Sequence, residues 1–335
     1  MWLVQRGTDM RRREFITLIG GAAASWPLKV RAQQTNSVTI GYFSGRSSNS
    51  EGLYKVAFHK GLKEAGYVEG QNVTIEYRFS DGQDDRLPVL AADLIRQQIT
   101  LLVATDGPSA LAAHAATKTI PIVFSTGGDP IKLGLAESLN RPNGNATGVY
   151  VFVSELGPKR LQLLREVVPH AKMIAFIVNL KSGSGRPQAQ AMQAAAQAMG
   201  QQLLVLSAST ESEVNEAFAT LVKRKAEAII YSANPLFQVL SGKLVALAAR
   251  HSIPAIYEWP EFVKSGGLMS YSSNRSEAGR QMGRYAAQIL KGAKPADLPL
   301  IQSSTFELVI NLKAARALGL TVPPTLLARA DEVIE

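Results

Sequence analysis

A strand, loop, helix and strand unit occurs twice in this sequence and limits the folds that the chain can adopt. The first copy is Leu101–Phe124, where two short apolar runs flank an alanine-rich segment and the polar loop Ser125–Pro130 follows. The second copy is Ala228–Tyr257, which also has a proline in its first loop and an Ile-Pro pair before its last apolar run. Continuous apolar runs are typical of strands that helices cover on both faces, and a helical connection favours parallel pairing with a right-handed crossover.

The segments upstream of the two copies also match. Val38–Phe43 starts a strand, helix and strand series in the first half of the chain, and Met173–Val178 starts the same series in the second half. Tandem units of one plan predict an α/β fold with two Rossmann-like lobes, each with a parallel sheet flanked by helices. In such sheets ligands bind beyond the carboxyl ends of the strands.

Three crossings between the lobes are expected, and together they would form a three-strand hinge. We place them near Tyr150–Glu155, Gly266–Tyr271 and Lys291–Pro299, where turn residues interrupt the pattern. The crossings divide the chain into a first lobe of residues 37–150 and 270–297 and a second lobe of residues 151–269 and 298–335.

Three local predictions concern helices. The spacing of apolar residues predicts a helix over Leu53–Ala65 with Tyr54 and Phe58 on its buried face. A short helix is predicted at Pro130–Leu139. Ser276 is predicted to cap a later helix of the first lobe.

The amino terminus has the parts of an export signal. A basic start at Met10–Thr17 precedes the apolar run Phe15–Trp26, and small residues at Val30 and Ala32 precede a break. Residues 12–16 also resemble the twin-arginine export motif. Residues 1–32 are therefore predicted to be an export signal for the periplasm, with residues 1–9 an upstream extension and Met10 the true start. The alternative is an amphipathic or disordered tail, and the run is too short for a membrane-spanning helix.

Composition excludes several kinds of chemistry. The chain has no cysteine, which excludes disulfides, thiolate metal ligands, cysteine nucleophiles and a lipid anchor on cysteine. The four histidines are scattered without metal-ligand spacing. The net charge is +9, of which residues 1–32 supply +4, and the remaining charge is spread without basic runs. This pattern argues against nucleic-acid binding and favours a solvated surface.

The motifs of common enzymes are missing. Ser182–Arg186 resembles a dinucleotide loop but lacks its third glycine, and neither a Walker lysine motif nor a Gly-x-Ser-x-Gly elbow occurs. His114 and His251 fall within or at the end of predicted helices, where packing or solvation is the simpler interpretation. The sequence therefore predicts no cofactor, no metal and no enzymatic activity.

Polar residues follow the carboxyl ends of many predicted strands and make up the candidate ligand site. They are Ser44, Thr105, Ser109, Thr126, Asp129, Asn179, Asn234 and Glu258. Such groups suit a polar small molecule, although about half of them are expected to be helix caps only. Asp129 and Glu258 follow equivalent strands of the repeat, so we expect them to face each other across the cleft and hold a ligand amine.

Aromatic residues close to the same loops are candidate walls of an apolar pocket, with core packing as the alternative for each. They are Tyr42, Tyr150, Phe237, Tyr257 and Trp259.

Several segments together resemble the substrate-binding family of ABC transporters that includes tryptophan- and tyrosine-binding members. They are Arg11–Gly21, Ile120–Phe124 with Asp129-Pro130, Gly266–Tyr271, Phe306–Leu312 and Leu327–Glu335. The resemblance covers essentially the whole chain and implies a type I periplasmic-binding-protein fold, with two lobes that close on a ligand. Asp106–Ser109 departs from the Gly-Ser-Pro that often follows the third strand in this family.

The resemblance implies an exported solute-binding protein of an ABC importer. Such a protein captures an amino acid or similar small organic ligand and delivers it to a permease in the inner membrane, and we expect it to be a monomer. One alternative is an extracytoplasmic sensor of the same fold that docks on a receptor kinase. Another is a two-lobed transferase, which would need a nucleotide site.

Overall fold

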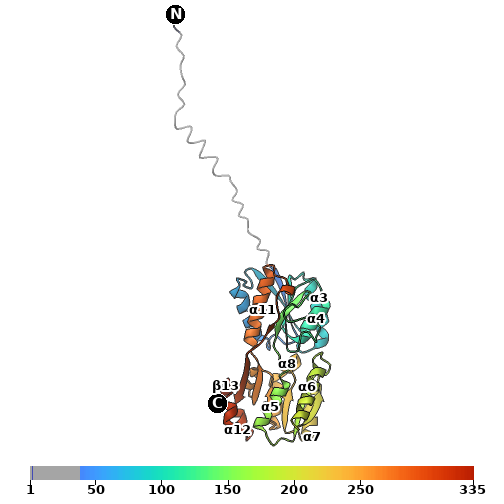
Figure 1. Cartoon of the computed structure of the whole chain (residues 1–335), viewed down its shortest axis with the longest axis vertical. Helices are drawn as coiled ribbons and strands as arrows, with labels where there is room; N and C mark the ends of the chain where they lie inside the picture. The colour runs from blue at the N-terminus through green and yellow to red at the C-terminus, as the bar shows by residue number, and fades with distance from the viewer. Residues whose placement is uncertain (1, 3–37) are drawn as a thin grey trace. The chain divides into compact units, whose positions relative to one another are not determined.

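Residues 38–335 carry two separate β-sheets, one in each of two lobes (Figure 1). The computed structural model describes Trp2 and residues 38–335, so the predicted export signal lies outside the part that it describes. The sheet of the first lobe has the order β11-β5-β4-β3-β1-β2, and all its strands pair in parallel. Its strands are β1 (Val38–Ser44), β2 (Val73–Phe79), β3 (Leu101–Ala104), β4 (Ile122–Thr126), β5 (Ala146–Tyr150) and β11 (Ile301–Gln302).

The sheet of the second lobe has the order β13-β12-β10-β9-β8-β6-β7, and among its neighbours β10 and β12 pair antiparallel. Its strands are β6 (Met173–Val178), β7 (Gln202–Ser207), β8 (Ala228–Tyr231), β9 (Ala255–Tyr257), β10 (Met269–Ser273), β12 (Phe306–Asn311) and β13 (Glu332–Ile334).

The predicted repeat is confirmed by the strand orders. β4-β3-β1-β2 of the first lobe corresponds position by position to β9-β8-β6-β7 of the second. The fold class is therefore as predicted: two α/β lobes, each with a largely parallel sheet flanked by helices. Because parallel strands need long crossovers, each repeat places its helices on the faces of its own sheet.

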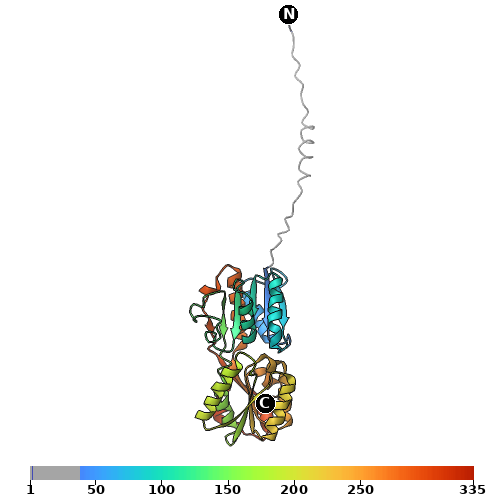
Figure 2. The same cartoon turned by 90° about the vertical axis from the view of Figure 1, so that its right-hand side faces the viewer.

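Helices cover both faces of each sheet, as the view in Figure 2 shows. In the first lobe, Ile40 and Tyr42 of β1 pack in the core toward α2 and α11, whereas Phe43 packs in the core toward α3 and α4. The helices of this lobe are α2 (Gly52–Glu64), α3 (Leu87–Arg96), α4 (Gly107–Ala116) and α11 (Arg275–Leu290). Both faces of β1 are thus apolar and buried, which explains its continuous apolar sequence.

The second lobe repeats this layering. Phe176 lies in the core beneath α5 and α6, and Ile177 lies in the core beneath α7 and α9. The helices of this lobe are α5 (Gly157–Val167), α6 (Gly185–Ala198), α7 (Glu211–Lys223), α8 (Pro235–Val239), α9 (Ser241–Arg250), α10 (Pro260–Lys264), α12 (Leu312–Ala317) and α13 (Pro324–Leu327). Of the helices in residues 38–335, none is both long enough and apolar enough to cross a bilayer.

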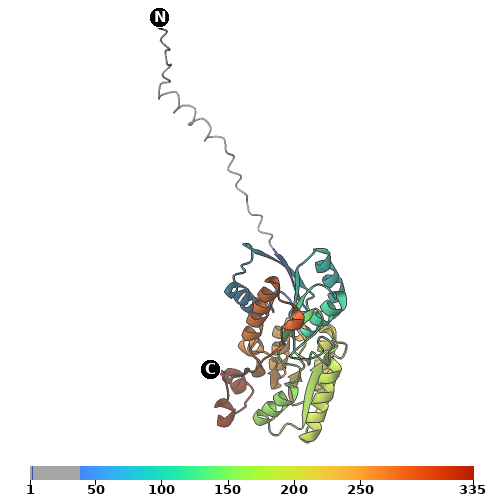
Figure 3. The same ribbon diagram turned by 45° about the horizontal axis from the view of Figure 1, so that its top comes forward.

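Helices α2 and α11 lie side by side, although more than 200 residues separate their sequences (Figure 3). Glycines allow this close packing. A Cβ atom at Gly61 would lie 2.1 Å from the carbonyl oxygen of Arg280, and one at Gly283 would lie 2.2 Å from that of Phe58. Only residues without a side chain fit at these two positions.

Two of the predicted lobe boundaries are wrong. β10 belongs to the second sheet, so the chain returns to the first lobe after Ser273 and not at residue 270. β11 belongs to the first sheet, so the last crossing follows Gln302 and not residue 297. The segment around Gly266 is the turn after α10, where Gly266 has a φ of +104°. The first crossing, after Tyr150, lies where it was predicted.

Two local predictions are also wrong. Residues 130–139 form turns instead of a helix, since Gly134 adopts a φ of +72° directly after a single turn that starts at Asp129. The cap of α11 is Asn274 and not Ser276, because the Asn274 Oδ1 atom accepts the backbone N–H of Glu277 at 2.9 Å. Asn and Ser both serve as caps, so the sequence alone does not choose between them.

Candidate functional site

A cavity lies between the carboxyl ends of the two sheets and is lined by residues of both lobes and of the first crossing. The space between its lining atoms, with the open mouth included, is about 610 Å³. The polar residues that matter for its chemistry are Arg46, Thr105, Asp106 and Thr126 from the first lobe and Asn234, Gln238 and Glu258 from the second. The aromatic side chains of Tyr54 and Trp259 line the cavity from opposite lobes.

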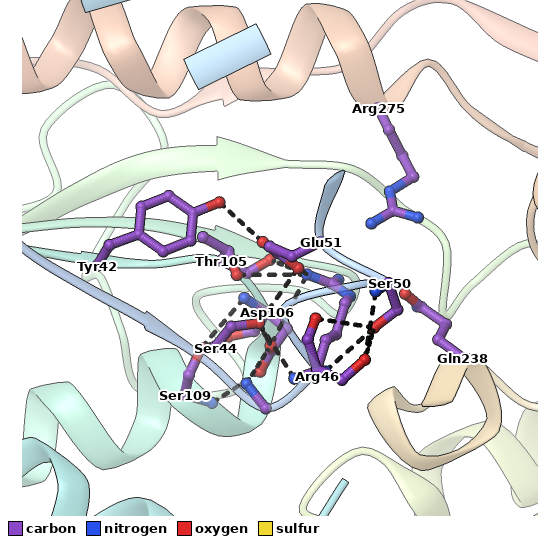
Figure 4. Close-up of polar contacts among 12 residues, drawn as sticks. Tyr42, Ser44, Arg46, Ser50, Glu51, Thr105, Asp106, Ser109, Gln238 and Arg275 are labelled. Carbon is purple, nitrogen blue, oxygen red and sulfur yellow. Dashed lines mark hydrogen bonds and ion pairs between the residues drawn. The ribbon is translucent and has the colours of Figure 1, made fainter. Parts of the chain in front are cut away.

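Arg46 is the centre of a buried network in the first lobe (Figure 4). Its Nη1 atom donates to Glu51 Oε2 at 3.1 Å and to the carbonyl of Thr105 at 2.9 Å, and it lies 3.8 Å from Asp106 Oδ2. The Nε atom of Arg46 is buried without a partner. Burial alone would lower the pKa of Arg46, but the carboxylates of Glu51 and Asp106 raise it above its ordinary value.

Glu51 is fully buried at the start of α2. Its Oε1 atom accepts a hydrogen bond from the hydroxyl of Tyr42 at 2.9 Å. Burial acts to raise the pKa of Glu51, but attraction to Arg46 and then to Arg275 outweighs it and holds that pKa below the ordinary value. The carboxylate is therefore ionised and paired in the folded protein.

Two of the predicted site residues, Ser44 and Ser109, hold Asp106 in place and do not line the cavity. The Oγ atom of Ser44 donates to Asp106 Oδ2 at 3.1 Å. Asp106 caps α4 by accepting the backbone N–H of Ser109 at 2.9 Å, and its own N–H donates to Ser109 Oγ at 3.2 Å. This reciprocal pair is a capping box.

Thr105 and Thr126, two of the predicted site residues, line the cavity at the ends of β3 and β4. Thr126 donates from Oγ1 to the carbonyl of Gly128 at 3.1 Å, which shapes the loop after β4. Both threonines are fully buried, so their polar atoms are inside the site and not at its rim.

Glu258 and Gln238 form the polar group of the second lobe. Gln238 Nε2 donates to Glu258 Oε1 at 3.1 Å, and the atoms Glu258 Oε2 and Gln238 Oε1 are buried without partners. Burial raises the pKa of Glu258 to about 7, although the positive charge of Arg160 and the hydrogen bond from Gln238 lower it in part. Buried polar atoms nearly always have partners, so these two are free to accept hydrogen bonds from a molecule in the cavity.

Asn234 adds a donor to this set. Its Oδ1 atom caps α8 by accepting the backbone N–H of Leu236 at 3.0 Å, which leaves Nδ2 buried without a partner. The cavity therefore offers unpartnered donors at Arg46 and Asn234 and unpartnered acceptors at Glu258 and Gln238. A molecule that carries both an anionic and a cationic group satisfies such a set.

Asp129 and Asn179 lie outside the cavity lining, so the expected pair of Asp129 and Glu258 across the cleft is not formed. Asp129 Oδ1 accepts the backbone N–H of Ile131 at 2.9 Å, and Asn179 Oδ1 accepts that of Lys181 at 3.0 Å. Both side chains stabilise the first turn after a strand. Asp129 and Asn179 therefore act as caps, which was the alternative considered for about half of the candidate site residues.

Sequence reasoning missed several residues of the site. Arg46 and Glu51 lie in a polar loop, where charged residues are normally solvated, and Tyr54 lies on the buried helix face, where it was predicted to be core. Among the candidate aromatic walls, Trp259 lines the cavity, whereas Tyr42, Phe237 and Tyr257 pack in the core. In residues 38–335 no group of three or more Asp, Glu or His side chains is placed to hold a metal ion.

Comparisons with known proteins find relatives whose names give amino-acid ligands. The chain is 29% identical over 267 residues to a tyrosine-binding protein of Clostridioides difficile, which covers 79% of this chain and 76% of that protein. A solved structure of an ABC domain from Streptococcus pneumonia in complex with L-Trp has a TM-score of 0.80 and 27% identity, covering 89% of this chain and all of that one.

A second solved structure allows a comparison of the lobe arrangement. The ligand-free, open structure of a substrate binding protein with adhesive properties from Clostridium difficile has 26% identity and covers 89% of this chain and 99% of that one, with a TM-score of 0.62. At nearly equal identity, the present structure is thus much more similar to the L-Trp complex than to the open form.

A family model described as ABC transporter substrate binding protein matches residues 48–334, which include every strand of the two sheets except β1 and every cavity residue except Arg46. The resemblance suggested by the sequence is therefore confirmed. The chain belongs to the family of ABC transporter substrate-binding proteins.

Proposed function

We propose that this chain is the exported solute-binding protein of an ABC importer and that its ligand is an amino acid with an aromatic side chain. The observation that carries the proposal is the buried, unpartnered Oε2 atom of Glu258 in a cavity that also presents an unpartnered guanidinium nitrogen of Arg46. The relatives that bind tyrosine and L-Trp support the aromatic class.

In the proposed complex each part of the ligand meets a different part of the cavity. The ammonium group pairs with Glu258 and Gln238, and the carboxylate receives hydrogen bonds from Arg46 and Asn234. Tyr54 and Trp259 flank the side chain. Charge-assisted hydrogen bonds in a site closed to water are strong, and aromatic walls add apolar contact.

Transport follows from closure of the two lobes. Both lobes contribute polar atoms to the cavity, so the ligand stabilises the closed arrangement over the open one by its differential contacts. We propose that the closed form, as a monomer, then docks on a permease of the inner membrane.

Calorimetry against a set of amino acids, purines and small carboxylates tests the ligand. L-Tyrosine or L-tryptophan is expected to bind saturably. The variant Glu258→Gln is expected to weaken binding by about 2–5 kcal/mol, because it leaves the ligand ammonium without its counter-charge. Asp129→Asn is the matched control, since Asp129 stabilises a turn outside the cavity; its affinity should stay within about threefold of the parent. Saturable binding of a purine or a dicarboxylate, with none of an aromatic amino acid, would contradict the proposal.

Export is a separate part of the proposal. Arg12 and Arg13 lie in the segment that resembles the twin-arginine motif. Changing both to lysine is expected to leave precursor in the cytoplasm, as cell fractionation would show. Undiminished delivery to the periplasm would indicate the general secretory route.

A further inference from the structure

Arg275 is a buried cation that donates a hydrogen bond neither to the network around Arg46 nor to the pair of Gln238 and Glu258. It is the first residue of α11, directly after the crossing from β10 of the second lobe to the helix of the first. Only 7% of the surface of Arg275 is exposed to solvent. Its Nη1 atom pairs with Glu261 Oε1 of α10 at 3.3 Å, and its Nε and Nη2 atoms are buried without partners. Such a burial needs a compensating contact.

Two aromatic rings supply that contact, one from each lobe. The central carbon of the Arg275 guanidinium lies 5.6 Å from the centre of the Tyr54 ring and 4.7 Å from the centre of the Trp259 ring. Both distances are within the range of cation–π attraction, which is strongest for tryptophan and for desolvated pairs. Arginine is suited to this position because its planar guanidinium stacks on aromatic faces, which a lysine ammonium cannot do in the same way.

The two rings that Arg275 contacts are also walls of the cavity. Arg275 does not line that cavity itself; it lines an adjoining depression that shares Gln238 and Trp259 with it. Figure 4 shows its side chain extending from the start of α11 on the side where Gln238 lies. The guanidinium therefore packs on these two rings from outside the cavity.

We propose that Arg275 is a positioning residue that couples the two lobes by holding Tyr54 and Trp259 in the geometry of the closed cavity. The contact with Tyr54 stays within the first lobe, whereas the contacts with Trp259 and Glu261 cross to the second. Opening of the lobes separates the guanidinium from Trp259, so this contact favours the closed form. The inference rests on the proposed function only in taking these rings as walls of the ligand site.

Trp259 makes a direct test possible. The sequence has three tryptophans, of which Trp2 and Trp26 lie in the amino-terminal segment. In the full chain with Trp2→Phe and Trp26→Phe, all indole emission comes from Trp259. Emission wavelength and quenching by acrylamide are measured without ligand in this parent and in the added variants Arg275→Gln, Arg275→Lys and Arg280→Gln. Arg280 is the matched control because it lies on the same helix and pairs with a glutamate, Glu64, away from the cavity.

The expected result is a shifted emission and faster quenching in Arg275→Gln, a partial effect in Arg275→Lys, and parental values in Arg280→Gln. L-Tyrosine, which is not excited at the red edge of tryptophan absorption, serves as the ligand probe. Its affinity is expected to fall roughly tenfold in Arg275→Gln, the size of a desolvated cation–π contact. If the glutamine variant does not fold, the lysine variant decides the question, since it keeps the charge and removes the stacking.

Two outcomes separate this inference from the proposed ligand. Parental emission and quenching in both Arg275 variants would overturn the role of Arg275, whatever the ligand data show. Altered emission in the Arg275 variants, in a protein whose parent binds no aromatic amino acid, would support the coupling by Arg275 and refute the proposed ligand instead. Full recovery of the Trp259 signal by lysine would show that charge alone is enough and would also overturn the stacking argument.

Discussion

Gln238 donates a hydrogen bond from Nε2 to Glu258 Oε1 at 3.1 Å and leaves the second carboxylate oxygen of Glu258 buried without a partner. Burial raises the pKa of this carboxyl to about 7. Near neutral pH the group is therefore divided between its protonated and ionised forms. Since only the ionised form pairs with a ligand ammonium, binding and ionisation are linked.

The first prediction is a pH dependence of ligand affinity. The affinity for L-tyrosine is expected to be level above the pKa of about 7 and to fall by about tenfold for each pH unit below it, because a proton must first leave Glu258. Titration calorimetry from acid to mildly alkaline pH measures this profile. In Glu258→Gln the affinity should be lower and independent of pH over the same range. A parental profile that stays flat through neutral pH would contradict the assignment of the ammonium to Glu258.

The second prediction concerns the ion pair of Glu51 and Arg46, which are joined at 3.1 Å and both buried. Glu51→Gln leaves the Arg46 guanidinium buried without its main counter-charge and is expected to lower the free energy of unfolding by about 3–5 kcal/mol. Urea denaturation measures the difference. Glu64→Gln is the control, since Glu64 pairs with Arg280 and Arg284 at the surface, and its midpoint should match that of the parent.

The same ion pair also determines how the free energy of unfolding changes with pH. The pKa of Glu51 is lower in the folded protein than in the unfolded chain because attraction to Arg46 outweighs the effect of burial. Its contribution is therefore complete above the unfolded pKa and is lost as the pH falls through the folded one. The difference between the parent and Glu51→Gln should shrink in acid. A constant difference at all pH values would show that the charge of Glu51 is not what stabilises the fold.

Much of the fold follows from the sequence because the repeat fixes it. Apolar runs such as Leu101–Ala104 are typical of central strands, and their helical connections favour parallel pairing. The lobe boundaries were harder to predict, since a pair of glycines at 266 and 267 reads equally well as a turn and as a crossing. The chain crosses after β10, which ends at Ser273.

Only some of the residues that line the cavity could be found from the sequence, and the reason is physical. Strand ends place Thr105, Thr126, Asn234 and Glu258 around the cavity, because parallel strands have their carboxyl ends at the same edge of a sheet. Whether a polar residue faces the cavity or caps its own helix depends on one side-chain rotation, which periodicity does not reveal. Arg46 was missed because its burial depends on Glu51 and Asp106, and Asp106 is 60 residues away in the sequence.

The third prediction tests the packing of α2 against α11. Alanine in a helix is normally more favourable than glycine by about 1 kcal/mol. At Gly61 the added Cβ would meet the carbonyl of Arg280 at 2.1 Å, so Gly61→Ala must push the helices apart and is expected to lower the midpoint of thermal unfolding by several degrees. Gly52→Ala, in the same helix with no atom within 4 Å of the added Cβ, should leave it unchanged or raise it. Equal midpoints for the two variants would contradict the observed helix contact.

The hinge contains a strained residue. Phe152, in the first crossing, has a φ of +54°, a conformation that is unusual for a bulky side chain. Its ring lies 4.0 Å from that of Tyr150 and 6.5 Å from that of Phe306, which follows the third crossing. The next residue, Val153, is held by a hydrogen bond from Arg160 Nη2 to its carbonyl at 3.1 Å. Hinge motions are absorbed by a few backbone angles at such positions.

The fourth prediction is that this strain belongs to the closed arrangement of the lobes. Phe152→Ala removes the ring and keeps the backbone cost of a positive φ, whereas Phe152→Gly removes both. If opening relieves the strain, the glycine variant should bind L-tyrosine about fivefold more tightly than the alanine variant, which corresponds to about 1 kcal/mol. Lys225, with a φ of +56° in the turn after α7, is the control: glycine and alanine at this position should differ in unfolding free energy but bind with the same affinity. Equal affinities for the two Phe152 variants would show that the hinge keeps this backbone angle in both states.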